Sequence, residues 1–364
     1  MKLRYSPSCF VSASLFVLVA VFTLPSQALV VGALHPADAF DNLNTLTDPS
    51  YVSLNPGLTP IVSNEGYSHT NSIEVDASTG SIKGYAGYKL NSAGQVTRTG
   101  NLIKTIAGST EEALLANSSG SVIYTNATVG TAPVGSGSGT VGNGFATISL
   151  VVDGSFNYTV GTPTLGLVGA VSVTVNPGGN VLNSTSYVVG GRMTNFDTQV
   201  MLPVAGSVFT REDLQVFDAF GNAILNPTIP GITYGANFVS TNPSALSMIV
   251  SLMVPIQQGD TITIGGSAGG GATHAFLEDF RNVSIGAMGN VDAAEGYVDF
   301  LNTAQLGIEL APGYTLTGAD APPLNIITTS PVPVPGAVWL FSSALLTLVG
   351  LARKDRVKTE NKIF

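Results

Sequence analysis

The sequence predicts an all-β protein built as a β-sandwich ectodomain, either one large sandwich or two smaller ones. Short runs of alternating apolar and polar residues recur along the chain, turn residues separate them, and little of it keeps a helical period. Glycine is abundant, at 42 of 364 residues, and only 10% of residues are charged, against about 25% in ordinary globular domains. Such a chain must present a surface of Ser, Thr, Asn and Gly, as antiparallel sheets with many turns do.

The first 28 residues predict a cleavable signal peptide. Lys2 and Arg4 form a positive start, residues 10–24 are apolar, and the small residue Ala28 ends the segment. This order is typical of a secretory leader cut after Ala28. The single cysteine, Cys9, lies inside the leader, so the exported chain is expected to hold no disulfide.

The region that follows the leader predicts loop first and then strands. To about residue 60 it is punctuated by Pro, Asn and Asp, with one short helix expected over 37–46. A β-hairpin comes next, because residues 72–76 and 81–88 alternate on either side of the turn residues 77–80.

The middle of the chain contains a glycine- and serine-rich stretch, residues 131–144. It is compatible with a boundary between two sandwiches and equally with one long loop inside a single domain. Beyond it, residues 145–152 and 155–160 alternate around Asp153-Gly154, which predicts a second tight hairpin.

The later part of the chain predicts more strands, with two exceptions. Residues 211–220 have moderate helical character and end at Gly221, a plausible helix stop. The glycine-rich residues 265–271 predict a flexible loop. The other expected strands are 121–125, 171–175, 186–189, 199–202, 246–255, 260–264, 275–284, 296–302 and 305–310.

No pattern in the sequence predicts catalysis. His35, His69 and His274 are scattered and form no zinc-binding pair. Residues 265–269 formally match the serine nucleophile elbow, but the glycines after Ser267 are a poor start for the helix that such an elbow needs. We therefore expect no enzyme, no catalytic residue and no cofactor.

Two binding hypotheses remain open. Asp292, Glu295 and Asp299 lie close together in sequence, and exported sandwiches bind calcium through such carboxylates, although a solvated acidic face explains them as well. A hydroxyl-rich surface could also bind sugars, with tyrosine rings stacking on them. The exported part has no tryptophan, however, and packing within strands also explains the tyrosines at 85, 88, 158 and 187.

Charge excludes one class of partner. The whole chain has 14 basic and 23 acidic residues; the leader and the last twelve residues hold seven of the basic and two of the acidic ones, which leaves 7 basic and 21 acidic residues between them. Nucleic-acid phosphates need a basic face, so we expect no nucleic-acid partner.

The end of the chain has three consecutive parts. Prolines at 331, 333 and 335 predict a stiff extended segment. Residues 337–352 hold no charge and are apolar on all sides, which predicts a short transmembrane helix. Arg353 and Lys354 then place the end of the chain in the cytoplasm.

This arrangement resembles the PEP-CTERM sorting signal, in its VPLPA-type variant. The matching residues are Val332, Pro333, Val334, Pro335 and Gly336 in the motif, Ala337, Trp339, Leu340, Phe341 and Leu351 in the helix, and Arg353 and Lys354 after it. In that family an exosortase, a membrane peptidase, recognises the tail and cuts near the proline motif, in Gram-negative bacteria that make exopolysaccharide. A plain C-terminal membrane anchor on a proline-rich stalk is the alternative.

The sequence thus divides into five expected segments and one expected function. The segments are a signal peptide (1–28), a β-rich exported domain (29–322), a proline-rich linker with the sorting motif (323–335), a transmembrane helix (336–352) and a basic tail (353–364). We expect an exported surface or matrix protein that an exosortase processes, with exopolysaccharide as a further candidate partner. The alternative is a secreted carbohydrate- or calcium-binding adhesive module.

Overall fold

The computed structural model describes most of the expected exported domain. The described residues are 29–35, 51–58, 60–62, 67–91, 94–99, 102–105, 115–131, 144–161, 163–197, 202–224, 232–274, 288–291 and 293–318. All of them belong to one compact unit, which ends at Asn325. The leader, the sorting motif, the expected transmembrane helix and the basic tail lie outside these residues, as do the expected helix at 37–46 and strand at 275–284.

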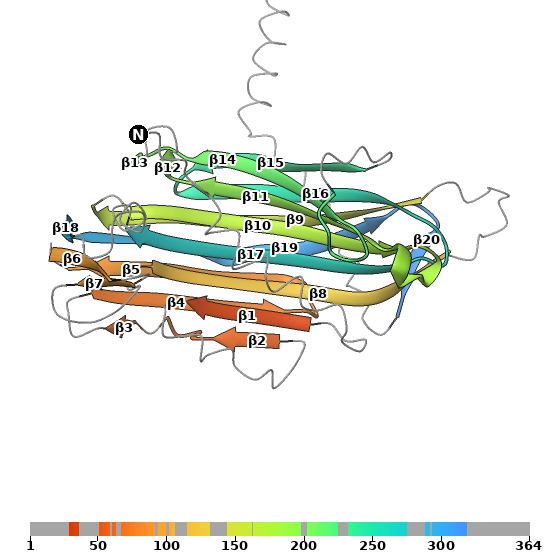
Figure 1. The fold of residues 1–364 in the computed structure, drawn as a ribbon, viewed down its shortest axis with the longest axis horizontal. Coiled ribbons are helices and arrows are strands. Elements are labelled where there is room, and N and C mark those ends of the chain that lie inside the picture. Colours follow the sequence, from red (N-terminus) through yellow and green to blue (C-terminus); the bar gives the residue numbers. More distant parts are fainter. Residues whose placement is uncertain are drawn as a thin grey trace, which may run out of the picture. The chain divides into compact units, whose positions relative to one another are not determined.

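Two large antiparallel sheets make up the unit (Figure 1). In spatial order, sheet 1 consists of β1 (Leu29–His35), β8 (Leu115–Thr131), β17 (Thr261–His274), β10 (Pro163–Asn176), β11 (Thr185–Thr194) and β14 (Phe209–Phe217), with β20 (Tyr314–Thr317) also paired to β8. Sheet 2 consists of β15 (Thr233–Asn242), β16 (Ala245–Ile256), β9 (Gly144–Val160), β19 (Ala294–Leu310), β5 (Ser81–Leu90), β4 (Tyr67–Asp76) and β2 (Tyr51–Leu54), with β3 (Ile61–Val62) also paired to β4.

Smaller elements complete the described part. β12 (Phe196–Asp197) pairs with β13 (Leu202–Pro203), and β6 (Gly94–Thr99) lies between β18 (Met288–Val291) and β7 (Leu102–Thr105). Two 3₁₀ turns, η2 (Pro177–Gly179) and η3 (Val181–Asn183), join β10 to β11.

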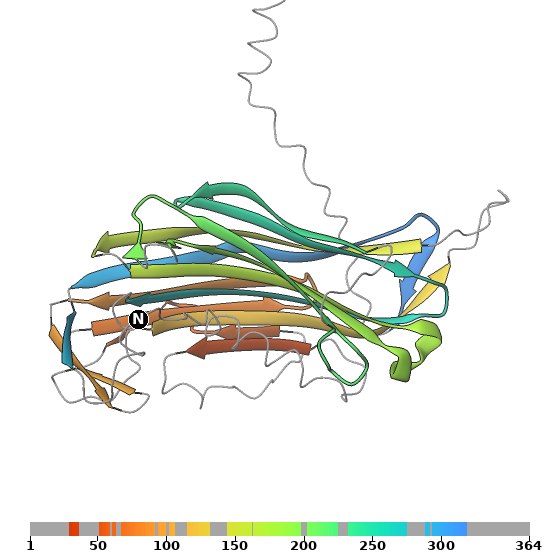
Figure 2. The ribbon, with the colours of Figure 1, turned by 45° about the horizontal axis from the view of Figure 1, so that its top comes forward.

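The two large sheets pack face to face, as Figure 2 shows from a second side. β8 lies against β4 and β5, and β10 lies against β9 and β16. The prediction of an all-β, sandwich-like architecture is therefore confirmed for the described residues.

Both sides of the glycine- and serine-rich stretch contribute to both sheets. β1 and β8 precede it and lie in sheet 1 beside later strands, while β4 and β5 precede it and lie in sheet 2 beside β19. One continuous set of buried side chains fills the space between the sheets. Of the two interpretations left open, the described strands thus match one large sandwich, in which residues 132–143 connect β8 of sheet 1 to β9 of sheet 2.

The first predicted hairpin is confirmed. β4 and β5 pair in continuous register from Tyr67 opposite Leu90 to Asp76 opposite Ser81. The turn between them closes with Gly80 at φ +70°, a left-handed conformation that glycine adopts without strain. At the start of the turn the Asp76 carboxylate accepts hydrogen bonds from the Ser78 backbone N–H and hydroxyl at 2.8 and 2.7 Å.

The predicted hairpin at Asp153-Gly154 is wrong. β9 runs straight through both residues, because β16 pairs with it on one side and β19 on the other. Gly154 does not form a turn but allows the backbone of β19 to approach closely, because a Cβ there would lie 2.7 Å from the backbone oxygen of Asp299. The pairing on both sides of the strand thus overrides the local turn preference.

The predicted helix over 211–220 is also wrong. β14 is an extended edge strand that pairs with β11, and Leu214 and Val216 point toward the core. It ends where the Asp218 carboxylate accepts the N–H groups of Phe220 at 2.9 Å and Asn222 at 2.8 Å. The polar residues of this stretch belong to a strand and an Asx turn.

The glycine-rich residues 265–271 are the middle of β17 and not a flexible loop. Two of these glycines face large side chains of β19 in the opposite sheet: a Cβ on Gly266 would lie 2.9 Å from Leu306, and one on Gly270 would lie 2.9 Å from Phe300. The glycines therefore make room for the core, a requirement that composition alone does not reveal.

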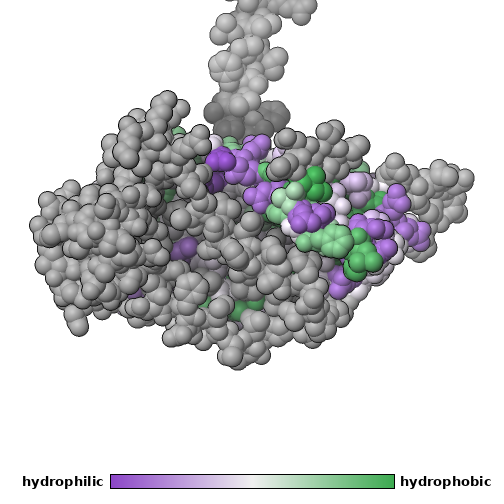
Figure 3. Space-filling view, viewed as in Figure 1, coloured by the Kyte–Doolittle hydropathy of each residue, from purple (hydrophilic) through white to green (hydrophobic). Residues whose placement is uncertain are grey.

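The surface of the described residues mixes polar and apolar character. In the view of Figure 3, hydrophilic and hydrophobic residues lie side by side where described residues reach the surface. Exposed apolar side chains include Val181 and Leu182 of η3, at 64% and 70% exposure.

Candidate functional site

The residues predicted for signal cleavage, sorting and anchoring, Ala28 and those within 332–354, lie outside the described part of the chain. Within the described part, no helix is long and apolar enough to cross a membrane. The described residues that could form a site lie on the faces and edges of the sandwich.

The calcium candidates are not gathered at one point by the described strand. Glu295 and Asp299 lie on the outer face of β19, four residues apart, which is about 13 Å along an extended strand. The Glu295 carboxylate instead pairs with Lys89 Nζ at 2.9 Å, and Asp292 lies outside the described residues. Among the residues that the structure describes, no three His, Cys, Asp or Glu side chains come together as a metal site would require.

The formal nucleophile elbow is not an elbow. Ser267 lies in the middle of β17, opposite Ser121 of β8 and Ala170 of β10. A nucleophile elbow requires a sharp strand-to-helix turn, and none occurs here.

The predicted tyrosines separate into two groups. Tyr88 and Tyr187 are buried in the core, at 3% and 8% exposure, and the Tyr158 hydroxyl accepts the Gly206 N–H at 3.2 Å. Tyr85, by contrast, is half-buried on the outer face of sheet 2. Of these four tyrosines, Tyr85 lies on the outer face, and no described residue forms a hydrogen bond with its hydroxyl.

Tyr85 forms a ring pair with Tyr297. The two ring centroids are 5.1 Å apart and the ring planes meet at 28°, a stacked arrangement of the kind that aromatic pairs favour. The pair joins two neighbouring strands of sheet 2, since Tyr85 belongs to β5 and Tyr297 to β19, where it lies directly opposite Gly87.

Gly87 allows the Tyr85 ring to lie close to the sheet. A Cβ built on Gly87 would lie 3.1 Å from a ring carbon of Tyr85 and 3.2 Å from its hydroxyl oxygen. The ring therefore lies along β5 over the backbone of Gly87, rather than standing away from the sheet. Burial raises the pKa of the Tyr85 hydroxyl, with Tyr297, Asp299 and Glu295 adding to the effect, so the hydroxyl remains a neutral donor at physiological pH.

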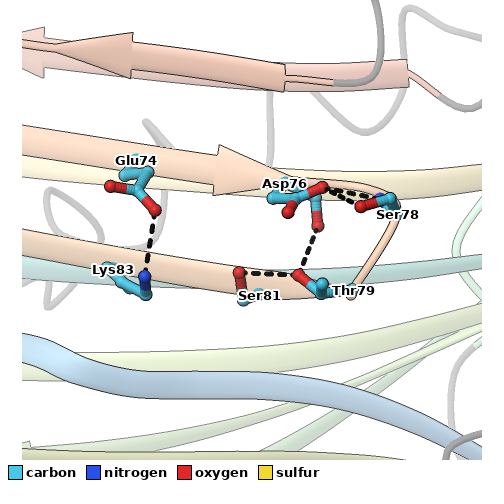
Figure 4. Close-up of polar contacts among 6 residues, drawn as sticks. All are labelled: Glu74, Asp76, Ser78, Thr79, Ser81 and Lys83. Atoms are coloured by element: carbon cyan, nitrogen blue, oxygen red, sulfur yellow. Dashed lines mark hydrogen bonds and ion pairs between the residues drawn. The ribbon is translucent and has the colours of Figure 1, made fainter.

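Two cross-strand ion pairs flank the tyrosines. Lys83 Nζ lies 2.9 Å from Glu74 Oε1 across β5 and β4 (Figure 4), and Lys89 lies 2.9 Å from Glu295 across β5 and β19. The hydrogen bond from Lys89 holds the pKa of Glu295 below its ordinary value. In each pair a carboxylate balances the charge of the lysine beside the rings.

A hollow opens on the same face of sheet 2, at Asp299, two residues along β19 from Tyr297. Its volume is about 390 Å³, within the range of roughly 300–1,000 Å³ for small-ligand sites. Two aspartates and four serines contribute to its lining, Asp153, Asp299, Ser155, Ser240, Ser244 and Ser247, together with Gly154, Ala245 and Leu246. Register shifts occur on both sides of it, after Phe238 in β15 and after Asp299 in β19. Such bulges redirect side chains and are common near binding sites.

Sequence reasoning missed half of this site. It considered Tyr85 and Asp299, but not Tyr297, Asp153 or the serines of the hollow. Alternation along 295–299 could have placed Glu295, Tyr297 and Asp299 on one face. Nothing local could have shown that this face lies beside Tyr85, which is far away in sequence.

The fold and this face define a two-sheet β protein with a partly aromatic, hydroxyl-lined outer surface. Comparison with known proteins adds no identification: no protein-family model matches the chain, and neither a curated protein nor a solved structure matches it.

Proposed function

We propose that this chain is an exported, non-enzymatic protein of the cell surface or extracellular matrix, which an exosortase sorts in a biofilm- and exopolysaccharide-producing Gram-negative bacterium. One observation carries the proposal: the proline motif at 332–336, the uncharged apolar stretch at 337–352 and the basic pair Arg353-Lys354 follow one another in the order of a PEP-CTERM signal.

The proposed mechanism concerns delivery. The leader directs export and is removed after Ala28. Residues 337–352 then hold the precursor in the membrane, while Arg353 and Lys354 keep its end in the cytoplasm. An extended proline segment presents residues 332–336 outside this helix, where a membrane peptidase could reach them.

The properties of the β unit support an extracellular location. The exported part has no cysteine and few charges, so it can fold in an oxidising compartment without disulfide chemistry. A surface of Ser, Thr, Asn and Gly carries little charge repulsion against polysaccharide or against further copies of the chain. Structural association is therefore the proposed role of the unit.

The second candidate is a carbohydrate- or calcium-binding adhesive module. The stacked tyrosines beside a hydroxyl-lined hollow favour its carbohydrate form. The calcium form has less support, because the Glu295 carboxylate is already paired with Lys89.

Cell fractionation with proline variants tests the sorting proposal. We expect the wild-type chain in the outer envelope or medium, and the double variant Pro333→Ala, Pro335→Ala in the membrane fraction as uncut precursor. The double variant Pro322→Ala, Pro323→Ala is the matched control, because it removes two prolines upstream of the motif, and it should distribute like wild type. Equal membrane retention of all three chains would instead indicate a plain membrane anchor.

A further inference from the structure

We infer that the outer face of β5, β19 and β9 binds an uncharged polysaccharide, with the Tyr85–Tyr297 pair as its stacking surface and the hollow beside Asp299 as its hydroxyl-binding end. This inference rests on the proposed function, because only an exported chain would encounter extracellular polysaccharide. It adds the binding surface and the class of ligand.

The ring pair supplies the apolar part of the site. Sugar rings have apolar C–H faces, which pack on aromatic rings as other amphipathic groups do. Tyr85 lies along the sheet over Gly87, and Tyr297 stacks on it with centroids 5.1 Å apart. Because each ring restrains the other, a ligand that packs on them orders little that was mobile before, which lowers the entropic cost of binding.

The hollow supplies the polar part. Four serine side chains and the carboxylates of Asp153 and Asp299 line it, and hydroxyl and carboxylate oxygens are suitable partners for sugar hydroxyls. One Asp299 oxygen, Oδ1, accepts the Leu301 N–H at 2.9 Å, so the side chain is already oriented. Among the described residues nothing donates to its other oxygen, which can therefore accept a hydrogen bond from a ligand.

The two parts form one continuous surface. Tyr297 and Asp299 are two residues apart on the same face of β19, about 7 Å along the strand. β9 continues this surface: Asn157 lies opposite Tyr297 and Ser155 opposite Asp299. Asn157 Nδ2 donates to Ser155 Oγ at 2.9 Å, which leaves the serine hydroxyl able to donate to a ligand. A surface of this length suits several sugar units of a polymer better than one monosaccharide.

Charge selects an uncharged polymer. The lysines beside the rings are occupied by Glu74 and Glu295, so they offer little to a uronate or sulfate group. Asp153 and Asp299 at the hollow would repel such groups. A basic peptide would tolerate the two carboxylates, but the four serines of the lining and the two lysines beside the rings favour hydroxyl groups over cations.

Affinity electrophoresis of the full chain tests the inference. The chain is purified in a polyoxyethylene detergent, which has no sugar headgroup, and run in native gels that contain hydroxyethyl cellulose, dextran or galactomannan. We expect at least one of these neutral polymers to retard the wild-type chain. Tyr297→Ala should weaken that retardation about five- to tenfold, from the loss of a stacking partner, and Tyr297→Phe should retain most of it.

Tyr234→Ala is the matched control. Tyr234 is 46% exposed on β15, outside the proposed site, so its removal should leave the retardation unchanged. Thermal melting of every variant checks that the sandwich is intact.

Three results would overturn the inference: no retardation by any of the three neutral polymers, equal retardation of wild type and Tyr297→Ala, or preferential binding of alginate or of poly-L-lysine over the neutral polymers. Sorting is measured separately by fractionation. A correctly sorted chain that no neutral polymer retards therefore keeps the proposed function and loses this site.

Discussion

The ring of Phe300 in β19 lies directly over Gly84 of the neighbouring strand β5, and it is fully buried. The same ring faces Gly270 of β17 in the opposite sheet, where an added Cβ would lie 2.9 Å away. One phenylalanine therefore fills the space that two glycines leave, one in each sheet. This packing explains why glycine occurs inside long strands of this protein, where it would ordinarily weaken a sheet.

Gly84→Ala should destabilise the sandwich. A Cβ at this position would overlap the Phe300 ring, and overpacking of this kind costs about 1–3 kcal/mol. Denaturant unfolding measures the change. Gly190→Ala is the control, since the nearest atom to its Cβ would be 3.8 Å away, and it should change stability by less than about 0.5 kcal/mol. If Phe300→Leu does not relieve part of the Gly84→Ala penalty in the double variant, the packing account is incorrect.

Tyr124→Phe should lower stability by about 1 kcal/mol. The Tyr124 hydroxyl, on β8 of sheet 1, donates a hydrogen bond to the Ala77 carbonyl in the β4–β5 turn of sheet 2. Burial raises the pKa of Tyr124, with Asp76 adding to the effect, so this donor stays protonated in mildly alkaline buffer. Thermal melting at pH 7 and pH 9 should show the same loss at both, and a loss confined to one pH would argue against this hydrogen bond.

Glu212→Ala should loosen the edges of the two sheets. Glu212 Oε2, on edge strand β14 of sheet 1, accepts the Ala236 N–H of edge strand β15 in sheet 2 at 2.8 Å. Without this acceptor we expect amide hydrogen exchange at Ala236 to accelerate roughly two- to tenfold, the equivalent of one ordinary hydrogen bond. Glu212→Gln keeps an acceptor oxygen and should exchange nearly as wild type. If exchange at Ala236 accelerates equally in both variants, the loss of the Glu212 charge, and not the loss of the hydrogen-bond acceptor, causes the effect.

Acid should weaken the protein through its lowered carboxyl pKa values. At Asp76, burial by itself raises the pKa, but the hydrogen bonds from Ser78 and Thr79 together outweigh it and hold the pKa below 3.8. A carboxyl with a lowered folded-state pKa contributes stability above its unfolded pKa and loses that contribution as pH falls through the folded value. Melting temperatures should therefore fall as pH drops below about 4. Asp76→Asn cannot titrate, so its melting temperature should fall less over this interval, and an identical decline would contradict the assignment.

Calcium removal should leave the melting temperature unchanged. Glu295 is engaged with Lys89, and the described residues gather no set of three metal-binding side chains. Differential scanning fluorimetry with EDTA and with added calcium measures the effect. A rise of several degrees on adding calcium would revive the site predicted at Asp292, Glu295 and Asp299.

Those parts of the fold that turn chemistry determines could be predicted from the sequence. The β4–β5 hairpin closes on Asp76 and Gly80, and the β16–β17 turn closes on Gly259 at φ +90° with Asp260 accepting the Gln257 N–H at 2.8 Å. In both turns the hydrogen bonds form between residues close in sequence, so the local pattern is sufficient to predict the turn.

Features that depend on distant strands could not be predicted. Asp153-Gly154 has the composition of a turn, but pairing with β16 and β19 keeps it extended. The glycines of β17 are explained only by the space that Leu306 and Phe300 of the other sheet occupy. For the same reason the Tyr85–Tyr297 pair emerges only after β5 and β19 are placed side by side.

Intact mass spectrometry of the wild-type chain, recovered from the envelope and medium of an exosortase-containing host, shows whether an exosortase removes the C-terminal segment. We expect a mature protein that begins at Leu29 and ends at or close to residues 332–336, without the apolar stretch 337–352 and the basic tail. A mature protein that retains residues 337–364 would contradict exosortase sorting and would make the chain a membrane-anchored β ectodomain.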